Sequence, residues 1–311
     1  MNPLIRLKRT SSVFLIALAC FWLSPAAQAV LPSPTPDGGY PGFNTAEGTN
    51  ALFNLTTGMD NTAVGFSALF LETNGFANTA VGFNALFSNT SGANTAVGFN
   101  ALFNNTTGDN NTATGYGALY DNTTGSSNTA NGVGALADNT TGNFNTATGD
   151  SALEGNTTSG SNTANGYWAL RHNNGSFNTA SGNKALTSNT TGVRNTANGD
   201  EALLRNESGS GNTAQGYQAL ANNTGSFNVA IGYTAGINLT NGRDNIVIGT
   251  TGAVGDTNTI RIGTAVKQTA TYIAGIYGAT VPSGAAVVIG NGGRLGTVPS
   301  SERFKKDIAT N

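Results

Sequence analysis

Small and apolar residues recur at fixed places along most of this sequence. The phrase Asn-Thr-Ala-x-Gly, or a close variant, occurs thirteen times between Asn44 and Gly249. Nine of the twelve intervals are 17 residues and three are 16. With each first Asn counted as position 0, Ala recurs at +2, Gly at +4, Ala at +7 and Leu at +8. A short fixed period predicts a stacked fold in which each repeat contacts mainly its neighbours.

Seventeen residues suit one rung of a β-solenoid, with two short strands and two turns, whereas common helical repeats are about twice as long. Side chains alternate between the two faces of a strand, so the constant residues Asn78, Ala80 and Gly82 should point inward and the variable +3 residue outward. The +8 leucines should form the main apolar core. We therefore expect an all-β protein, a parallel β-solenoid or β-roll of about thirteen rungs.

The turn sequences agree with this expectation. Asn-Thr-Thr-Gly recurs at 105–108, 122–125, 139–142 and 189–192. We expect its Asn to bond to the local backbone and its Gly to supply a positive φ. Proline is absent from 43–281, as rungs that are hydrogen-bonded on both sides require.

The ends of the chain differ from the repeats. Residues 1–29 have the basic start, the apolar run and the Ala-x-Ala end of a signal peptide for export. Residues 30–43 form a proline-rich linker, and 44–249 are the solenoid repeats. Residues 250–299 should form a C-terminal β cap, with strands near 269–276 and 285–290, because an open solenoid end is a bare sheet edge.

Composition narrows the possible functions. Charged residues are 10% of the chain, against about a quarter in typical soluble domains. Without 1–29, 11 basic and 16 acidic residues leave a net charge of −5, which does not favour a nucleic-acid partner. The only Cys, Cys20, lies in the leader, and the only His is His172, in a turn. We expect no enzyme activity, no metal, no cofactor and no transmembrane span.

Two columns could lie on the surface. Position +1 is Thr in the first eleven rungs, which is reminiscent of ice-binding solenoids, although Thr is also simply a good strand residue. Positions +5 and +9 are aromatic in four successive rungs and polar or acidic in several later ones, which places them outside the core. Such an apolar stripe is typical of an interface. The interface candidates are Phe66, Phe70, Phe83, Phe87, Phe99, Phe103, Tyr116 and Tyr120.

The Asn-Thr-Ala-x-Gly and Ala-Leu phrases resemble the head repeats of trimeric autotransporter adhesins, over about two thirds of the chain. That family's typical period is 14 residues rather than 16–17. The resemblance implies a left-handed parallel β-roll, a homotrimer, and binding to host, extracellular-matrix, glycan or abiotic surfaces. The family's heptad stalk and C-terminal membrane-anchor strands have no counterpart here.

The tail Ser300-Ser301-Glu302-Arg303-Phe304-Lys305 is similar to the start of the endosialidase-type intramolecular chaperone domain of tail spikes. In that family the domain trimerises the β-structure and then cuts itself off before a Ser. The resemblance implies that Ser300 is a vestigial nucleophile and Lys305 the motif lysine. Residues 300–311 would be a remnant too short to fold or cleave.

These observations together lead us to expect an exported, non-enzymatic structural or adhesive protein of the cell surface, acting as a homotrimer. One alternative is a tail-fibre-like protein matured by the self-cleaving domain that is truncated here. Another is a solenoid that binds carbohydrate or ice.

Overall fold

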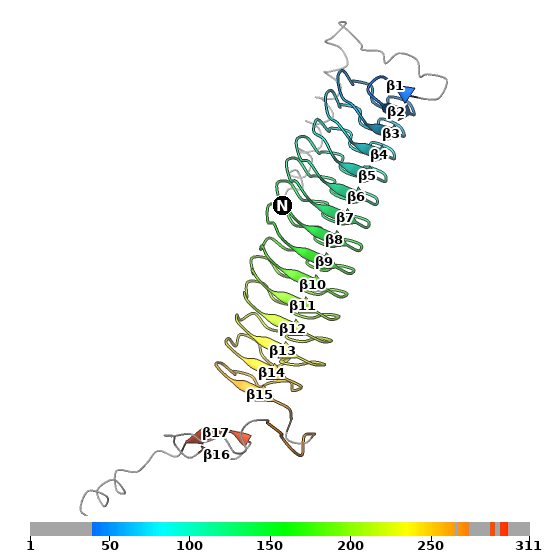
Figure 1. Cartoon of the computed structure of the whole chain (residues 1–311). Coiled ribbons are helices and arrows are strands. Elements are labelled where there is room, and N and C mark those ends of the chain that lie inside the picture. The colour runs from blue at the N-terminus through cyan, green and yellow to red at the C-terminus, as the bar shows by residue number, and fades with distance from the viewer. Residues whose placement is uncertain (1–38, 265–266, 274–286, 290–292, 298–311) are drawn as a thin grey trace, which may run out of the picture.

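The computed structural model describes residues 39–264, 267–273, 287–289 and 293–297. Residues from Gly39 to Ile262 form a long rod of stacked rungs (Figure 1). Fifteen strands make one sheet in chain order, in which β1 is antiparallel to β2 and every later pair is parallel. The strands are β1 Gly39–Tyr40, β2 Asn44–Glu47, β3 Thr62–Val64, β4 Thr79–Val81, β5 Thr95–Val97, β6 Thr112–Thr114, β7 Thr129–Asn131, β8 Thr146–Thr148, β9 Thr163–Asn165, β10 Thr179–Ser181, β11 Thr196–Asn198, β12 Thr213–Gln215, β13 Val229–Ile231, β14 Ile246–Ile248 and β15 Ile260–Ile262.

The predicted parallel β-solenoid is therefore confirmed. We number its rungs from 1, each beginning at the first Asn of its repeat, so that rung 2 starts at Asn61 and rung 13 at Asn245. The expectation of two strands per rung was wrong, because each rung has one strand, at +1 to +3. The Ala-Leu side consists of linked turns that bond to the next rung, as where Leu69 N donates to Ala85 O at 3.0 Å.

The core follows the predicted columns. The +7 alanines, the +8 leucines and, apart from the half-buried Ala46, the +2 alanines are buried. Leu52 and Leu239 extend the apolar filling at the two ends. Each buried leucine contributes about 1.5–3 kcal/mol to folding, while the alanines keep the interior narrow enough to be filled by one leucine per rung.

The +4 glycines do not lie inside the rod as predicted. Gly82 is half-buried at the end of its strand, and φ at this position lies between 123 and 144° from Gly48 to Gly232. A Cβ on Gly82 would also lie 2.7 Å from the carbonyl carbon of Gly98 in the next rung. This column is therefore fixed by backbone conformation and close approach of the chain, not by the size of the interior.

The role of the turn glycines was also predicted wrongly. Positive φ belongs instead to the buried leucines, for example Leu86 at 52°. Gly125 is required for space, because a Cβ there would lie 2.7 Å from Asn139 Nδ2. The prediction for the turn Asn holds, since Asn122 Nδ2 donates to Gly125 O at 2.9 Å.

Two columns of buried asparagines tie the rungs together. In the first column, at position 0, Asn128 N donates to Asn111 Oδ1 at 3.0 Å, and Asn111 Nδ2 donates to Gly125 O at 2.8 Å. The second column, at +11, forms what we call the amide ladder. Its members are Asn89, Asn105, Asn122, Asn139, Asn156, Asn173, Asn189, Asn206 and Asn223.

The amide ladder has one direction. From Asn105 to Asn206, each Nδ2 donates to the Oδ1 of the preceding rung, at 2.7–3.3 Å. At the N-terminal end, Asn89 Nδ2 donates at 2.6 Å to the carboxylate of Glu72, which occupies the +11 place of rung 2. Leu55 fills the same place in rung 1 and offers no oxygen that could accept a hydrogen bond. Glu72 suits the first place of the ladder because its carboxylate accepts hydrogen bonds and needs no acceptor in rung 1.

The 16-residue rungs lose their residue in the turn after the ladder Asn, and the strands keep their register. Two of these shortened turns disturb the ladder. The bond from Asn173 Nδ2 to Asn156 Oδ1 is the longest of the ladder, at 3.3 Å. Asn223 Nδ2 donates to Gly242 O instead of to Asn206 Oδ1. The Oδ1 of Asn206 is consequently buried without a partner.

The period does not end at Gly249, contrary to the prediction of a separate cap from residue 250. β15 continues the parallel sheet after a rung of 14 residues, with Ile260 paired to Ile246. Thr259 takes the place of the column-0 Asn and donates its N–H to Asn245 Oδ1 at 3.1 Å.

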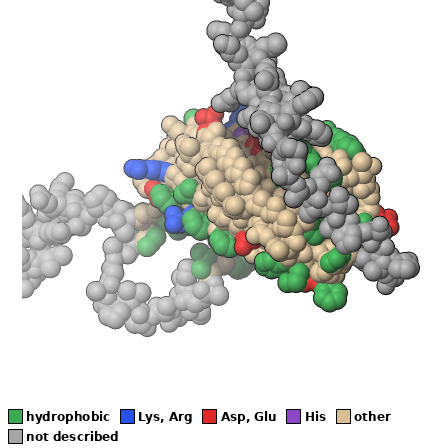
Figure 2. All heavy atoms as spheres, turned by 90° about the horizontal axis from the view of Figure 1, so that it is seen from above, with side chains coloured by type: hydrophobic (Ala, Val, Ile, Leu, Met, Phe, Trp, Pro, Cys, Tyr) green, Lys and Arg blue, Asp and Glu red, His purple; other side chains and the backbone are tan. Residues whose placement is uncertain are grey.

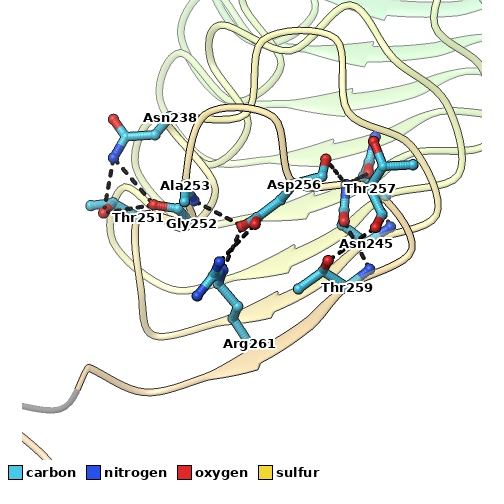
Figure 3. A network of polar contacts seen from close by, with 10 residues as sticks. Asn238, Asn245, Thr251, Gly252, Ala253, Asp256, Thr257, Thr259 and Arg261 are labelled. Carbon is cyan, nitrogen blue, oxygen red and sulfur yellow. Dashed lines mark hydrogen bonds and ion pairs between the residues drawn. The ribbon is translucent and has the colours of Figure 1, made fainter. Parts of the chain in front are cut away.

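The last turn is closed by a two-point ion pair (Figure 3). Arg261 donates to both carboxylate oxygens of Asp256, at 2.5 and 2.7 Å, and Ala253 N donates to Oδ2 at 2.9 Å. The hydrogen bond from Arg261 lowers the pKa of Asp256. This turn lets the shortened rung keep its strand in register with β14.

Beyond the rod, β16 (Val287–Ile289) and β17 (Leu295–Thr297) form a separate antiparallel pair, near the strand predicted at 285–290. Residues 269–273 contain no strand, and the rest of the strand predicted at 269–276 lies outside the described residues. The predicted signal peptide, residues 30–38 of the predicted linker and the 300–311 remnant also lie outside them.

Candidate interaction surface

The sheet side of the rod exposes positions +1 and +3. In rungs 5 to 8, both flanking residues of each strand are exposed and the central Ala is buried. The outward Thr column predicted from the sequence is thus present. Thr also stands at +3 in only two of these rungs, at Thr114 and Thr148, so a continuous pair of Thr columns does not form.

The aromatic candidates lie on the outside of the rod. The +5 side chains of rungs 2 to 5 are substantially exposed, at 45% for Phe66, 43% for Phe83, 42% for Phe99 and 61% for Tyr116. The +9 rings, Phe70, Phe87, Phe103 and Tyr120, are half-buried. A view from above shows apolar side chains on the periphery of the rod (Figure 2).

Each column is a continuous stack of rings. Along +5, the centroids of Phe66, Phe83, Phe99 and Tyr116 are 5.0, 5.1 and 5.2 Å apart, with ring planes within 12° of parallel. Along +9, Phe53 begins a similar stack that continues to Tyr120 at spacings of 5.1–5.6 Å. The rings cover one another's faces and turn their edges to solvent.

The two columns are neighbours. Burial, the Asp121 carboxylate and the Tyr116 phenol together raise the pKa of Tyr120, in that order of importance. We call the eight side chains at +5 and +9 of rungs 2 to 5 the aromatic zone. Its members are the eight residues identified from the sequence: Phe66, Phe70, Phe83, Phe87, Phe99, Phe103, Tyr116 and Tyr120.

Charge is almost absent around rungs 2 to 4 of the aromatic zone, and rung 5 carries one charged residue, Asp121, near Tyr120. From Asn61 to Gly108 the sequence has one charged residue, Glu72, and that side chain is buried. Burial raises the pKa of Glu72, while the hydrogen bonds from Gly75 and Asn89 act in the opposite direction. The exposed surface of these rungs is therefore built from aromatic, aliphatic, hydroxyl and amide groups.

Further along the rod some rungs carry charged residues in the same two columns, although Tyr167, Tyr217 and Tyr233 are still aromatic at +5. Position +5 is Asp150 in rung 7 and Asp200 in rung 10, and both are exposed. Position +9 is Glu154 and then Arg171, which pair at 2.6 Å. Arg171 also lies over the Trp168 ring, 4.3 Å from its centroid, so this cluster satisfies its own charges within one chain.

The described residues offer few side chains that could catalyse a reaction or bind a metal ion. His172 is exposed, as its predicted place in a turn implies. In the part of the chain that the structure describes, no three His, Cys, Asp or Glu side chains gather as a metal site would require. The vestigial pair Ser300 and Lys305 lies outside that part. The described residues include no helix that is long and apolar enough to cross a bilayer.

Sequence reasoning missed two features. One is a second aromatic pair at +5, Tyr217 and Tyr233, whose rings stack at 5.2 Å. The other is the amide ladder, whose signal was the constant Asn at +11. A scan of protein-family models and a search of curated protein sequences both found no match to this chain.

Proposed function

We propose that this chain is an exported structural or adhesive protein of the cell surface, has no catalytic role, and assembles as a homotrimer. The observation that carries the proposal is the aromatic zone. Its eight rings form two continuous stacks, four of the rings are substantially exposed, and an exposed apolar stripe of this kind is typical of an interface. Contact between copies in a closed, symmetric oligomer removes that surface from water.

The rod form supports the structural part of the proposal. Its sheet runs through fourteen parallel strands, and buried amides bond each rung to the next. Such a stack holds its surface columns at a constant spacing over a long distance. The resemblance of the repeats to adhesin heads supports an adhesive role and export.

Binding of a glycan through the aromatic zone is less well supported by the ring geometry. A pyranose ring packs flat against an aromatic face, and the faces inside each column are already covered by neighbouring rings. Ice binding is less well supported because few rungs carry Thr at both outward positions. The tail-fibre alternative depends on residues 300–311 and whatever follows them.

Two measurements test the proposal. Sedimentation equilibrium of the purified full chain should give three times the monomer mass, and a soluble monomer would contradict the trimer. Cells that carry the gene should attach to abiotic or host-matrix surfaces better than cells that lack it. Equal attachment would contradict the adhesive role, whatever the oligomeric state.

A further inference from the structure

We infer that copies of this chain contact one another only through the aromatic zone of rungs 2 to 5, and that the rods separate beyond it. The inference rests on the proposed trimer and specifies where its subunits meet. It follows from the +5 and +9 columns, which are aromatic in each of rungs 2 to 5 and carry charged residues in rungs 7, 8 and 10.

The contact region is set by the uncharged stretch from Asn61 to Gly108. An interface core excludes unpaired charge because desolvating a charged group costs several kcal/mol. Here the only charge, Glu72, points into the rod and accepts hydrogen bonds from Gly75 and Asn89. The surface from Asn61 to Gly108 can therefore be buried against a second copy without stranding a charge, and Asp121 is the one charged residue of rung 5.

Rungs 7 and 10 cannot continue the same contact. In a cyclic assembly of parallel rods, each rung lies at the height of the same rung in the other copies. The +5 column would then bring together the copies of Asp150, and further along the copies of Asp200. Converging carboxylates repel one another, and Arg171 of rung 8 already pairs with Glu154 of its own chain.

Other occupants fit the aromatic zone less well than a second copy. Anionic lipid or nucleic acid requires basic side chains, and rungs 2 to 4 contain none. A sugar requires open ring faces, which the stacking covers. A second copy presents the same apolar surface of ring edges. The two surfaces therefore match each other in charge and polarity.

The chain contains its own matched control for a mutational test. Phe83 and Phe99 lie at +5 inside the aromatic zone, while Tyr217 and Tyr233 lie at +5 outside it, and both pairs are stacked and exposed. We expect Phe83→Ser with Phe99→Ser to weaken association at least about 100-fold in sedimentation equilibrium, since interface aromatics dominate binding. Tyr217→Ser with Tyr233→Ser should leave association unchanged. The far-ultraviolet circular dichroism of both variants should match that of the natural chain.

Distances between copies provide a second test that leaves the aromatic zone intact. Thr107 and Thr191 are both exposed and both lie at +13, five rungs apart. Each is replaced by Cys in a full chain carrying Cys20→Ser, labelled with a nitroxide, and measured by double electron–electron resonance. We expect a longer distance between copies at position 191 than at position 107.

Each outcome separates this inference from the proposed function. Equal distances at the two positions, or an oligomer that survives the Phe83→Ser and Phe99→Ser changes, would overturn the restricted contact while leaving the trimer in place. A monomer with the aromatic zone intact would overturn both the trimer and the contact. A monomer that inserts into neutral lipid vesicles would assign the aromatic zone to a membrane instead.

Discussion

The direction of the amide ladder makes a sharp prediction at Asn122. Its Nδ2 donates to Asn105 Oδ1 at 2.7 Å, and its Oδ1 accepts from Asn139 Nδ2 at 2.7 Å. Asn122→Asp preserves shape and the acceptor but removes the donor. The introduced carboxylate would face the Asn105 oxygen, acceptor against acceptor, in the middle of the rod.

The magnitude follows from which bonds are lost. Asn122→Ala leaves Asn105 Oδ1 without its donor, while Asn139 Nδ2 keeps its bond to Gly142 O. Each buried polar atom left without a partner costs about 1–3 kcal/mol, so we expect a loss of about 2–4 kcal/mol. Asn122→Asp adds an uncompensated buried charge, and we expect about 3–5 kcal/mol at pH 7, although its side chain is closer in shape to Asn.

The dependence on pH distinguishes the two variants. Burial raises the pKa of the introduced carboxyl above its value of about 3.9 in the unfolded chain. The neutral form, which can donate to Asn105, is therefore fully present below about pH 4 and is lost as the pH rises through the folded-state pKa. The Asn122→Asp variant should approach the natural chain in acid, whereas the deficit of Asn122→Ala should stay constant.

Urea unfolding followed by circular dichroism between pH 3 and 7 measures both effects. Thr124→Asp is the matched control, since Thr124 is exposed in the same turn and gains the same charge near Asp121. A deficit for Asn122→Asp that equals the Thr124→Asp deficit, or that does not change with pH, would refute a ladder of fixed direction.

Three further predictions concern other columns. Because burial raises the pKa of Glu72, the natural chain should lose stability relative to Glu72→Gln as pH rises above 4.5, in the same unfolding assay. Gly82→Ala, at φ 141° and against the next rung's backbone, should destabilise the rod by more than about 2 kcal/mol in thermal melts, whereas Gly117→Ala, at φ 62° with open space around it, should lose about 1 kcal/mol or less. Leu119→Ala should cost about 2–5 kcal/mol and Asn131→Ala less than about 0.5, and equal losses would mean that the inner and outer faces are wrongly assigned.

The sequence predicted the rod because its period and its constant columns report burial directly. The +8 leucines and the +2 and +7 alanines are constant since any change there alters a packed interior. The aromatic columns could be placed outside because acidic residues replace them in later rungs. These inferences depend only on which positions tolerate change.

The backbone conformation, the hydrogen bonds between rungs and the register of β15 could not be predicted from which positions tolerate change. A hydrophobic pattern reports burial and not φ, so the left-handed backbone at Leu86 and the turns on the Ala-Leu side were missed. Asn is common in turns, and that role hid its bonds from rung to rung. The register of β15 depends on the conformation of the shorter last turn, where Asp256 pairs with Arg261, so Thr259 could not be recognised from the sequence.

The missing bond between Asn206 and Asn223 divides the rod into two parts of unequal cohesion. On its N-terminal side, an unbroken chain of amides connects Glu72 to Asn206. On its C-terminal side this ladder is absent, and the rungs from Asn212 onward are held by the sheet, the column-0 Asn, the apolar filling and single contacts such as the Asp256–Arg261 pair. A stack joined only through nearest neighbours opens from its weaker end. We therefore expect the rod to fray from the β15 end, so that in hydrogen-exchange measurements the amide hydrogens beyond Asn206 exchange before those of the rungs that carry the aromatic rings.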